Sequence, residues 1–283
     1  MDAHIHDAAR ITSYAHEGLR FDVRDEGPLG GQPVVLLHGF PQDSRSWDRL
    51  VPLLHARGFR TLAVDQRGYS PGARPRSRWA YRLSELTADI VALIDQHELG
   101  PVHVVGHDWG AAVAWTLAAR RPDLVRTLTA LSAPHPAAFV RALLTSSQIR
   151  KSWYMLAFQV PVLPERAFMA GGIGRRALLT SGMTDAQADR DLEPMRERSR
   201  IRRALNWYRA MPFTTPRSIT AQVRVPTLYV WSDRDFGIGP VAARLTERYV
   251  TGPYTFETLP GVSHWIPEEA PEQVDALLGA HLR

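Results

Sequence analysis

The sequence contains no cysteine, a single lysine and no long apolar run. Without thiols, the chain forms no disulfide bonds and uses no thiolate chemistry. No stretch reaches the roughly 18 apolar residues of a membrane-spanning helix, and residues 1–20 contain acidic and histidine side chains where a signal peptide is apolar. We therefore expect a soluble, cytoplasmic protein without a membrane span.

Basic residues exceed acidic ones, giving a net charge of +5 at pH 7, and nearly all of them are arginine because Lys151 is the only lysine. The densest stretch, residues 196–203, mixes arginines with acidic and apolar residues, which is typical of a solvated helix face. We therefore expect no nucleic-acid partner. The sequence also has no metal-ligand spacing and no glycine-rich phosphate loop, so we expect neither a metal nor an organic cofactor.

Short apolar runs alternate with longer helical patterns along the 283 residues. This alternation predicts an α/β protein with a mostly parallel central sheet and helices on both of its faces. An additional edge strand is predicted at residues 19–24. The predicted strands of the parallel sheet are residues 33–37, 61–64, 102–105, 127–131 and 227–231.

The alternation stops between residues 131 and 226, where helical periodicity continues without a convincing strand. It resumes afterwards with a strand, a helix, a further strand at 254–259 and a final helix. We therefore predict a core of residues 1–134 and 217–283, interrupted by a helical lid at residues 135–216.

The most specific motif is VHVVGHDWGAA, in which an apolar strand is followed by Asp108 and then by a helix. Gly106 and Gly110 stand two positions on either side of Asp108. This pattern resembles the nucleophile elbow, a sharp turn that lifts one side chain above the sheet, with aspartate in place of the usual serine. The alternative is that Asp108 only caps the helix.

A second motif, LHGFP at residues 37–41, follows the strand at 33–37. It resembles the HGxP motif of α/β-hydrolases. There, the backbone N–H groups of Phe40 and Trp109 would form an oxyanion hole. The alternative is an ordinary Gly-Pro loop.

The third motif, GVSHW, lies after the last predicted strand, and we expect its His264 to act as a base. Two carboxylates follow the strand at 227–231 and are candidates to orient His264. Resemblance to the α/β-hydrolases, which usually hold this acid a few residues beyond the strand and before an apolar residue, favours Asp235. Asp233, which could instead pair with Arg234 or cap the turn, remains the alternative.

From the HGFP motif to GVSHW, the chain resembles the α/β-hydrolase-fold epoxide hydrolases. Tyr154 and Tyr208 stand where this family holds two ring-opening tyrosines, and they are the only tyrosines between residues 135 and 226. The alternative is that both only pack the lid. The expected substrate-binding side chains are Trp109, Trp153, Phe158 and Trp207.

The resemblance implies an enzyme that converts epoxides to vicinal diols. Asp108 would attack the epoxide and form an ester, while Tyr154 and Tyr208 donate to the leaving oxygen. Water activated by His264 and Asp235 would then hydrolyse the ester. The expected partners are a small-molecule epoxide and water, and the expected state is a monomer or homodimer.

Two other functions stay open. A haloalkane dehalogenase uses the same three residue types, and Trp109 would then help to bind halide. A non-catalytic protein that binds a small ligand under the lid is the second alternative. A serine esterase is disfavoured because Asp108 would form an anhydride with an ester.

Overall fold

The structure, a computed structural model, describes residues 9–170, 172–215 and 219–283. Within these ranges, eight strands form one sheet in the spatial order β1-β2-β4-β3-β5-β6-β7-β8. Every neighbouring pair from β4 to β8 is parallel, whereas β1 with β2 and β2 with β4 are antiparallel. The strands are β1 (Ser13–His16), β2 (Leu19–Glu26), β3 (Pro33–Leu37), β4 (Arg60–Val64), β5 (Val102–His107), β6 (Val125–Leu131), β7 (Thr227–Ser232) and β8 (Tyr254–Leu259).

Helices fall into two groups according to their place in the chain. Those that alternate with the strands are α1 (Val51–Ala56), α2 (Leu83–Gln96), α3 (Trp109–Arg120), α13 (Pro240–Leu245), α14 (Ile266–Glu269) and α15 (Pro271–His281). Those between β6 and β7 are α4 (Pro136–Thr145), α5 (Gln148–Lys151), α6 (Trp153–Ala157), α7 (Leu163–Met169), α8 (Gly172–Thr180), α9 (Asp185–Leu192), α10 (Arg198–Ala204) and α11 (Asn206–Arg209). The 3₁₀ turns are η1 (Ser44–Trp47), η2 (Arg78–Tyr81), η3 (Pro122–Leu124), η4 (Pro194–Arg196), η5 (Met211–Phe213) and η6 (Thr246–Tyr249).

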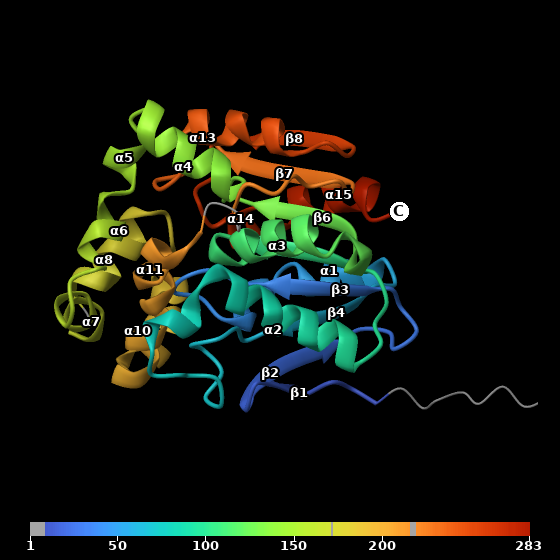
Figure 1. Cartoon of the computed structure of the whole chain (residues 1–283), viewed down its shortest axis with the longest axis horizontal. Helices are drawn as coiled ribbons and strands as arrows, with labels where there is room; N and C mark the ends of the chain where they lie inside the picture. Colours follow the sequence, from blue (N-terminus) through green and yellow to red (C-terminus); the bar gives the residue numbers. More distant parts are fainter. Residues whose placement is uncertain (1–8, 171, 216–218) are drawn as a thin grey trace, which may run out of the picture.

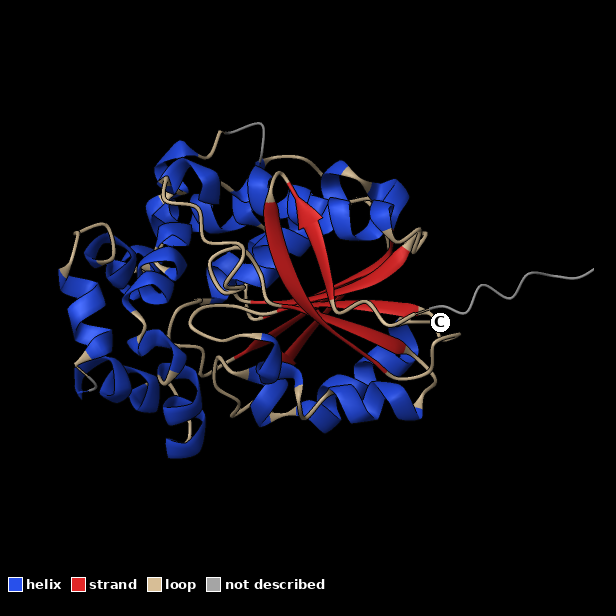
Figure 2. Cartoon of the chain, turned by 90° about the horizontal axis from the view of Figure 1, so that it is seen from below, coloured by secondary structure: helices blue, strands red, loops and turns tan. Residues whose placement is uncertain are grey.

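The sheet is buried on both faces, as the unbroken apolar runs predict. In β3, Val35 and Leu37 belong to a core with α2 and α3, whereas Val34 and Leu36 belong to a second core with α1 and α15. Figure 2 shows helices on both sides of the sheet. This arrangement follows from the alternation of side chains along a strand, and it confirms the predicted α/β architecture with a mostly parallel sheet between helices.

The prediction of a strand at residues 19–24 is confirmed, but its placement at the edge of the sheet is wrong. The strand β2 extends from Leu19 to Glu26 and pairs on one side with β4 and on the other with the short strand β1. Glu17 and Gly18 join β1 to β2, both with positive φ (49° and 74°), as a tight hairpin turn requires. The four-residue strand β1 therefore lies at the edge of the sheet. Its apolar patterning is too weak for the sequence to have predicted it.

The helices α6, α7, α8, α10 and α11 gather at the end of the sheet toward which β3, β6 and β7 point (Figure 1). The helix α4 instead packs against α13 of the core. We propose that residues 135–216 form the lid, although residues 216 and 217, where its predicted end falls, lie outside the described residues. Within the described part of the chain, none of the helices has the length and apolarity needed to cross a bilayer.

Candidate active site

Asp108 stands at a sharp turn between β5 and α3. Its φ of 51° and ψ of −118° are unusual for a residue with a side chain, so the surrounding structure must hold this strained conformation. A Cβ at Gly106 would overlap the backbone of Gly110, and a Cβ at Gly110 would overlap the backbone of Leu37. The two glycines therefore permit the close backbone approach that the turn requires.

The carboxylate of Asp108 contacts groups from distant parts of the chain. Its Oδ1 accepts a hydrogen bond from the backbone N–H of Phe40 at 2.9 Å, and its Oδ2 lies 3.6 Å from Nε2 of His264. A Cβ at Gly39 would overlap the Asp108 side chain, so glycine is needed there as well. Asp108 makes no side-chain capping bond to α3, and the helix-cap alternative is therefore wrong.

Of the two residues predicted to form the oxyanion hole, Phe40 contacts this carboxylate and Trp109 follows Asp108 in the chain. Phe40 precedes a cis peptide bond to Pro41 and directs its N–H at Asp108. Trp109 is the first residue of α3, so its backbone N–H has no acceptor within the helix.

His264 connects Asp108 to Asp235. Its Nδ1 lies 2.8 Å from Oδ2 of Asp235, and the other oxygen of Asp235 accepts from the N–H groups of Gly237 and Ile238 at 2.7 and 2.8 Å. Asp233 instead accepts from the N–H of Gly261 and makes no contact with the His264 ring among the described residues. Asp235 is therefore the carboxylate positioned to orient His264.

Several residues that position this group were not predicted. The carbonyl of His264 accepts from Nε2 of His107 at 2.9 Å and from Oγ of Ser132 at 2.6 Å. Nζ of Lys151 donates to the carbonyl of Asp235 at 2.6 Å. The Phe236 ring lies 5.1 Å from the His264 ring, centroid to centroid. The sequence marks Lys151 because it is the only lysine, and it marks Phe236 because this residue directly follows Asp235.

The site holds a positive charge between two negative ones. Burial alone would lower the pKa of His264, but Asp235 and Asp108 outweigh it and raise that pKa to about 10. Burial alone would raise the pKa of Asp108, but the hydrogen bond and charge of His264 lower it overall. In the free protein, Asp108 is therefore ionised and His264 carries its second proton at neutral pH.

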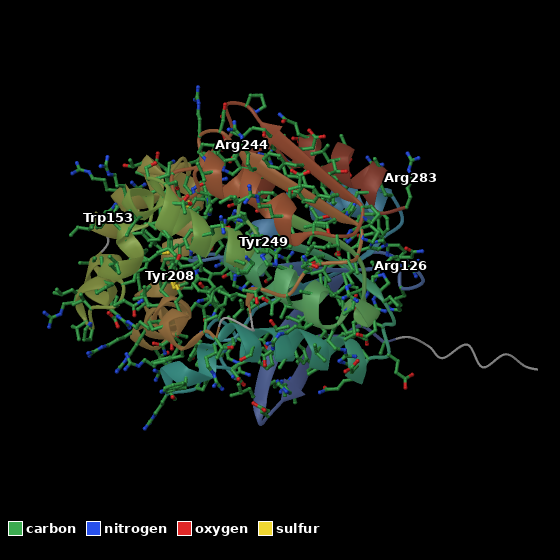
Figure 3. The ribbon with its side chains drawn as sticks, turned by 45° about the horizontal axis from the view of Figure 1, so that its top comes forward. Arg126, Trp153, Tyr208, Arg244, Tyr249 and Arg283 are labelled. Carbon is green, nitrogen blue, oxygen red and sulfur yellow. The ribbon has the colours of Figure 1, made fainter. Side chains whose placement is uncertain are left out.

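Tyr154 in α6 and Tyr208 in α11 face this group from the lid side. Their ring centroids lie 6.1 Å apart, and the Tyr208 ring meets Trp109 edge-on at 5.1 Å. Figure 3 shows Tyr208 well inside the molecule and Trp153 at its outer edge. Burial, followed by the charge of Asp108, raises the pKa of both tyrosines well above the usual value, so both keep their protons at neutral pH.

Two mostly apolar cavities of about 580 and 1100 Å³ meet at Asp108, Tyr154 and His264. Of the predicted substrate-binding residues, Trp109 lines the smaller cavity, and Trp153 and Phe158 line the larger one. Trp207 lines neither. It is fully buried, and its Nε1 donates to the carbonyl of Arg67 at 2.8 Å. Trp207 therefore packs beneath Trp109 and does not reach the cavities.

The fold, the elbow and the carboxylate–histidine–carboxylate arrangement define an α/β hydrolase, and the profile of the alpha/beta hydrolase fold family matches residues 32–271. The chain is 33% identical to AB hydrolase superfamily protein YfhM of Bacillus subtilis, over 92% of each chain. It is 31% identical to epoxide hydrolase A of Mycobacterium tuberculosis, over 92% of this chain and 93% of that one.

A crystal structure of epoxide hydrolase A from Mycobacterium thermoresistibile superimposes with a TM-score of 0.82 at 28% identity, covering 96% of this chain and 97% of that chain. The chain belongs to the epoxide hydrolase family of α/β hydrolases.

Proposed function

We propose that this enzyme hydrolyses epoxides to vicinal diols through a covalent ester on Asp108. One observation carries the proposal. An ionised carboxylate, held by the Phe40 N–H and beside His264, faces two protonated tyrosines across a mostly apolar cavity. A nucleophile on one side of the cavity and two proton donors on the other are what in-line opening of a strained ether requires. The names of the relatives support the same substrate class.

In the first half-reaction, an Asp108 oxygen attacks one epoxide carbon, and the bond from that carbon to the ring oxygen breaks. The oxygen leaves with the electron pair of that bond. Tyr154 and Tyr208 hydrogen-bond to it, and one of them transfers its proton. Because both hydroxyls keep their protons at neutral pH, both are competent donors. The product of this step is an alkyl ester of Asp108 that bears a neighbouring hydroxyl.

In the second half-reaction, His264 first gives up the proton that it carries in the free enzyme, and this proton replaces the one that the tyrosine donated. Neutral His264 then takes a proton from water, whose oxygen adds to the carbonyl carbon of the Asp108 ester. The negative charge that develops on the carbonyl oxygen is stabilised by the N–H groups of Phe40 and Trp109. Collapse of this tetrahedral species releases the second diol oxygen, which takes up the remaining proton of that water, and restores the carboxylate beside protonated His264. Asp235 keeps the His264 ring in position throughout, through the 2.8 Å contact with Nδ1.

The experiment that tests this proposal is a single turnover of styrene oxide in ¹⁸O-water with enzyme in excess. The first oxygen delivered comes from Asp108, so the diol should be unlabelled. Under multiple turnover, the label should appear because water has by then exchanged into the carboxylate. A diol that carries one ¹⁸O atom in the first turnover excludes the ester.

Incubation with 1-chlorobutane tests the dehalogenase alternative. We expect diol from styrene oxide and no chloride release, and the reverse result favours the dehalogenase. A cytoplasmic location and a monomeric or homodimeric state remain predictions from the sequence.

A further inference from the structure

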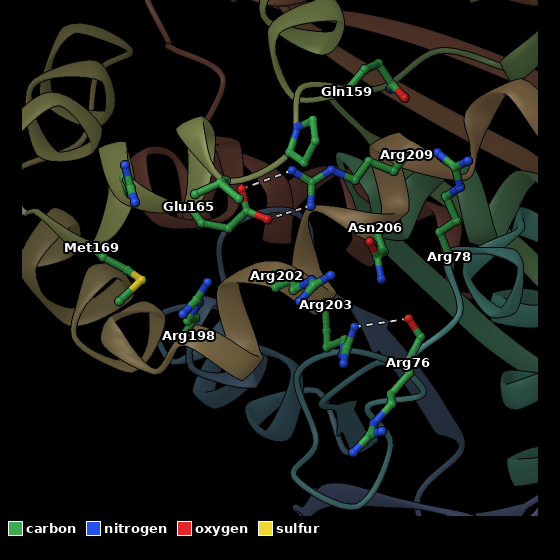
Figure 4. Close-up of a pocket in the computed structure, with 13 residues that line it drawn as sticks. Arg76, Arg78, Gln159, Glu165, Met169, Arg198, Arg202, Arg203, Asn206 and Arg209 are labelled. Carbon is green, nitrogen blue, oxygen red and sulfur yellow. Dashed lines mark hydrogen bonds and ion pairs between the residues drawn. The ribbon is translucent and has the colours of Figure 1, made fainter.

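A separate pocket of about 440 Å³ lies behind α11, and seven arginines from four segments of the chain line it (Figure 4). Arg209 is buried, and the other six are exposed or half-buried. These six are Arg76 in the loop before η2, Arg78 at the start of η2, Arg166 in α7, and Arg198, Arg202 and Arg203 in α10. The pocket shares only Arg166 with the larger cavity of the candidate active site.

The positive charge of this pocket is almost uncompensated. Glu165 is the one carboxylate among the lining residues, and Arg209 already binds both of its oxygens at 2.7 and 3.0 Å (Figure 4). Arg203 donates to the backbone carbonyl of Arg76, and Arg78 lies over the Phe213 ring. In the described ranges, none of the six remaining arginines forms an ion pair with a carboxylate.

Some arginines elsewhere in the described ranges are paired with carboxylates, whereas others, such as Arg126 and Arg244, are exposed and form no ion pair there. Arg175 binds two aspartates, Arg190 binds Asp191 and Glu268, and Arg67 binds Asp89. By contrast, α10 presents Arg198 and Arg202 four positions apart, where like charges destabilise a helix. What distinguishes this cluster is that six arginines without an ion pair in the described ranges line one pocket, where a bound anion would reduce their repulsion.

We propose that the arginine pocket binds a small organic anion that carries a diphosphate group. Guanidinium groups form paired hydrogen bonds with phosphate oxygens, and several such groups approaching from different segments suit a group with many oxygens. The pocket also has an apolar wall, which includes Val162 and Met169 and would accept the organic part of the ligand. Its volume suits a ligand of this size.

A bound anion would contact segments of the chain that are distant in sequence and so link them. It would contact α10 and the loop before η2, and also Gln159, whose side chain donates to the backbone carbonyl of Tyr208 at 2.8 Å. Because such an anion binds only the folded chain, it should raise the melting temperature, and the increase should grow with the logarithm of its concentration above the dissociation constant.

The test is calorimetric titration of the full chain with inorganic pyrophosphate at fixed ionic strength and without substrate. The pocket variant is Arg198→Gln with Arg202→Gln. The matched control is Arg126→Gln with Arg244→Gln, which removes the same charge from exposed positions elsewhere (Figure 3). We expect one saturable site in the wild type and in the control, and a dissociation constant at least about tenfold higher in the pocket variant.

No saturable binding to the wild type, or an equal loss in the control, would overturn the proposal. A parallel titration with citrate tests whether the pocket selects phosphate over carboxylate groups. If citrate binds as tightly as pyrophosphate at equal ionic strength, the pocket does not select phosphate and the ligand class is wrong. Because both titrations are made without an epoxide, their outcome is independent of the proposed hydrolase activity. A normal melting temperature in the absence of anion shows that the pocket variant is folded.

Discussion

Replacing Tyr154 and Tyr208 by phenylalanine, singly and together, separates the two donors that we assign to ring opening. The change removes one oxygen from each side chain and keeps the ring. The packing of Tyr208 against Trp109 and Phe158, at 5.1 and 4.9 Å between centroids, is therefore preserved. Any loss of rate then reports the hydroxyls themselves.

The expected magnitude follows from the number of donors. A hydrogen bond to a charged oxygen contributes about 1.5–3 kcal/mol, so losing one hydroxyl should slow alkylation by roughly ten- to a hundredfold while the other donor remains. Losing both removes general acid catalysis, which is worth about 10²–10⁴ in rate, and leaves the alkoxide without a donor in a mostly apolar cavity. The two effects are not additive because both hydroxyls act on one oxygen.

The assay is the single-turnover rate of ester formation from styrene oxide, followed by rapid quench and intact-protein mass. Tyr254→Phe is the matched control because Tyr254 is a partly buried tyrosine in β8, outside both cavities. A double variant that opens the epoxide at nearly the wild-type rate would refute the assignment. A dehalogenase would tolerate the double change, because halide leaves without a proton, and would instead be sensitive to replacement of Trp109.

Further predictions concern His264. In His264→Gln, alkylation should proceed and hydrolysis should stop, so the intact mass should rise by the mass of the epoxide; an unmodified variant would contradict the role of base. The second concerns stability against pH. Although burial lowers the pKa of His264, Asp235 and Asp108 raise it from 6.5 to about 10. The charged histidine therefore stabilises the fold fully below pH 6.5, and this stabilisation is lost as the pH rises toward 10. Measured by urea unfolding between pH 6.5 and 10, the free energy of unfolding should fall more steeply with pH in the wild type than in His264→Gln. Equal pH dependence in the two proteins would exclude a stabilising charge on His264.

The positions of Asp108, Asp235 and His264 could be predicted because each follows a strand of a parallel sheet. The carboxyl ends of such strands meet at one edge, so residues distant in sequence come together there. The choice between Asp233 and Asp235 was harder from sequence, since both lie in the same short loop. It depends on which carboxylate the N–H groups of Gly237 and Ile238 turn toward His264.

The lid was less predictable because its side-chain directions depend on how the helices pack. Trp207 and Tyr208 are neighbours in α11, so they point in different directions, and the sequence does not say which one faces Asp108. The Nε1 of Trp207 is bound to the Arg67 carbonyl, which leaves Tyr208 facing the cavity. Lys151, which holds the loop of Asp235 from the far end of α5, could not be assigned until the lid was placed over the core.

The charges at the site imply an order for the two half-reactions we propose. In the free enzyme, protonated His264 is the counterion of both Asp108 and Asp235, and because its raised pKa keeps it protonated at neutral pH, it cannot accept a proton from water. Ester formation removes the negative charge of Asp108, and with it the hydrogen bond and Coulomb attraction that this carboxylate contributes to the pKa of His264. The pKa must therefore fall on alkylation, and the histidine becomes able to give up its proton and then to take one from water. The same side chain thus holds the nucleophile ionised before attack and becomes a base only after the ester exists.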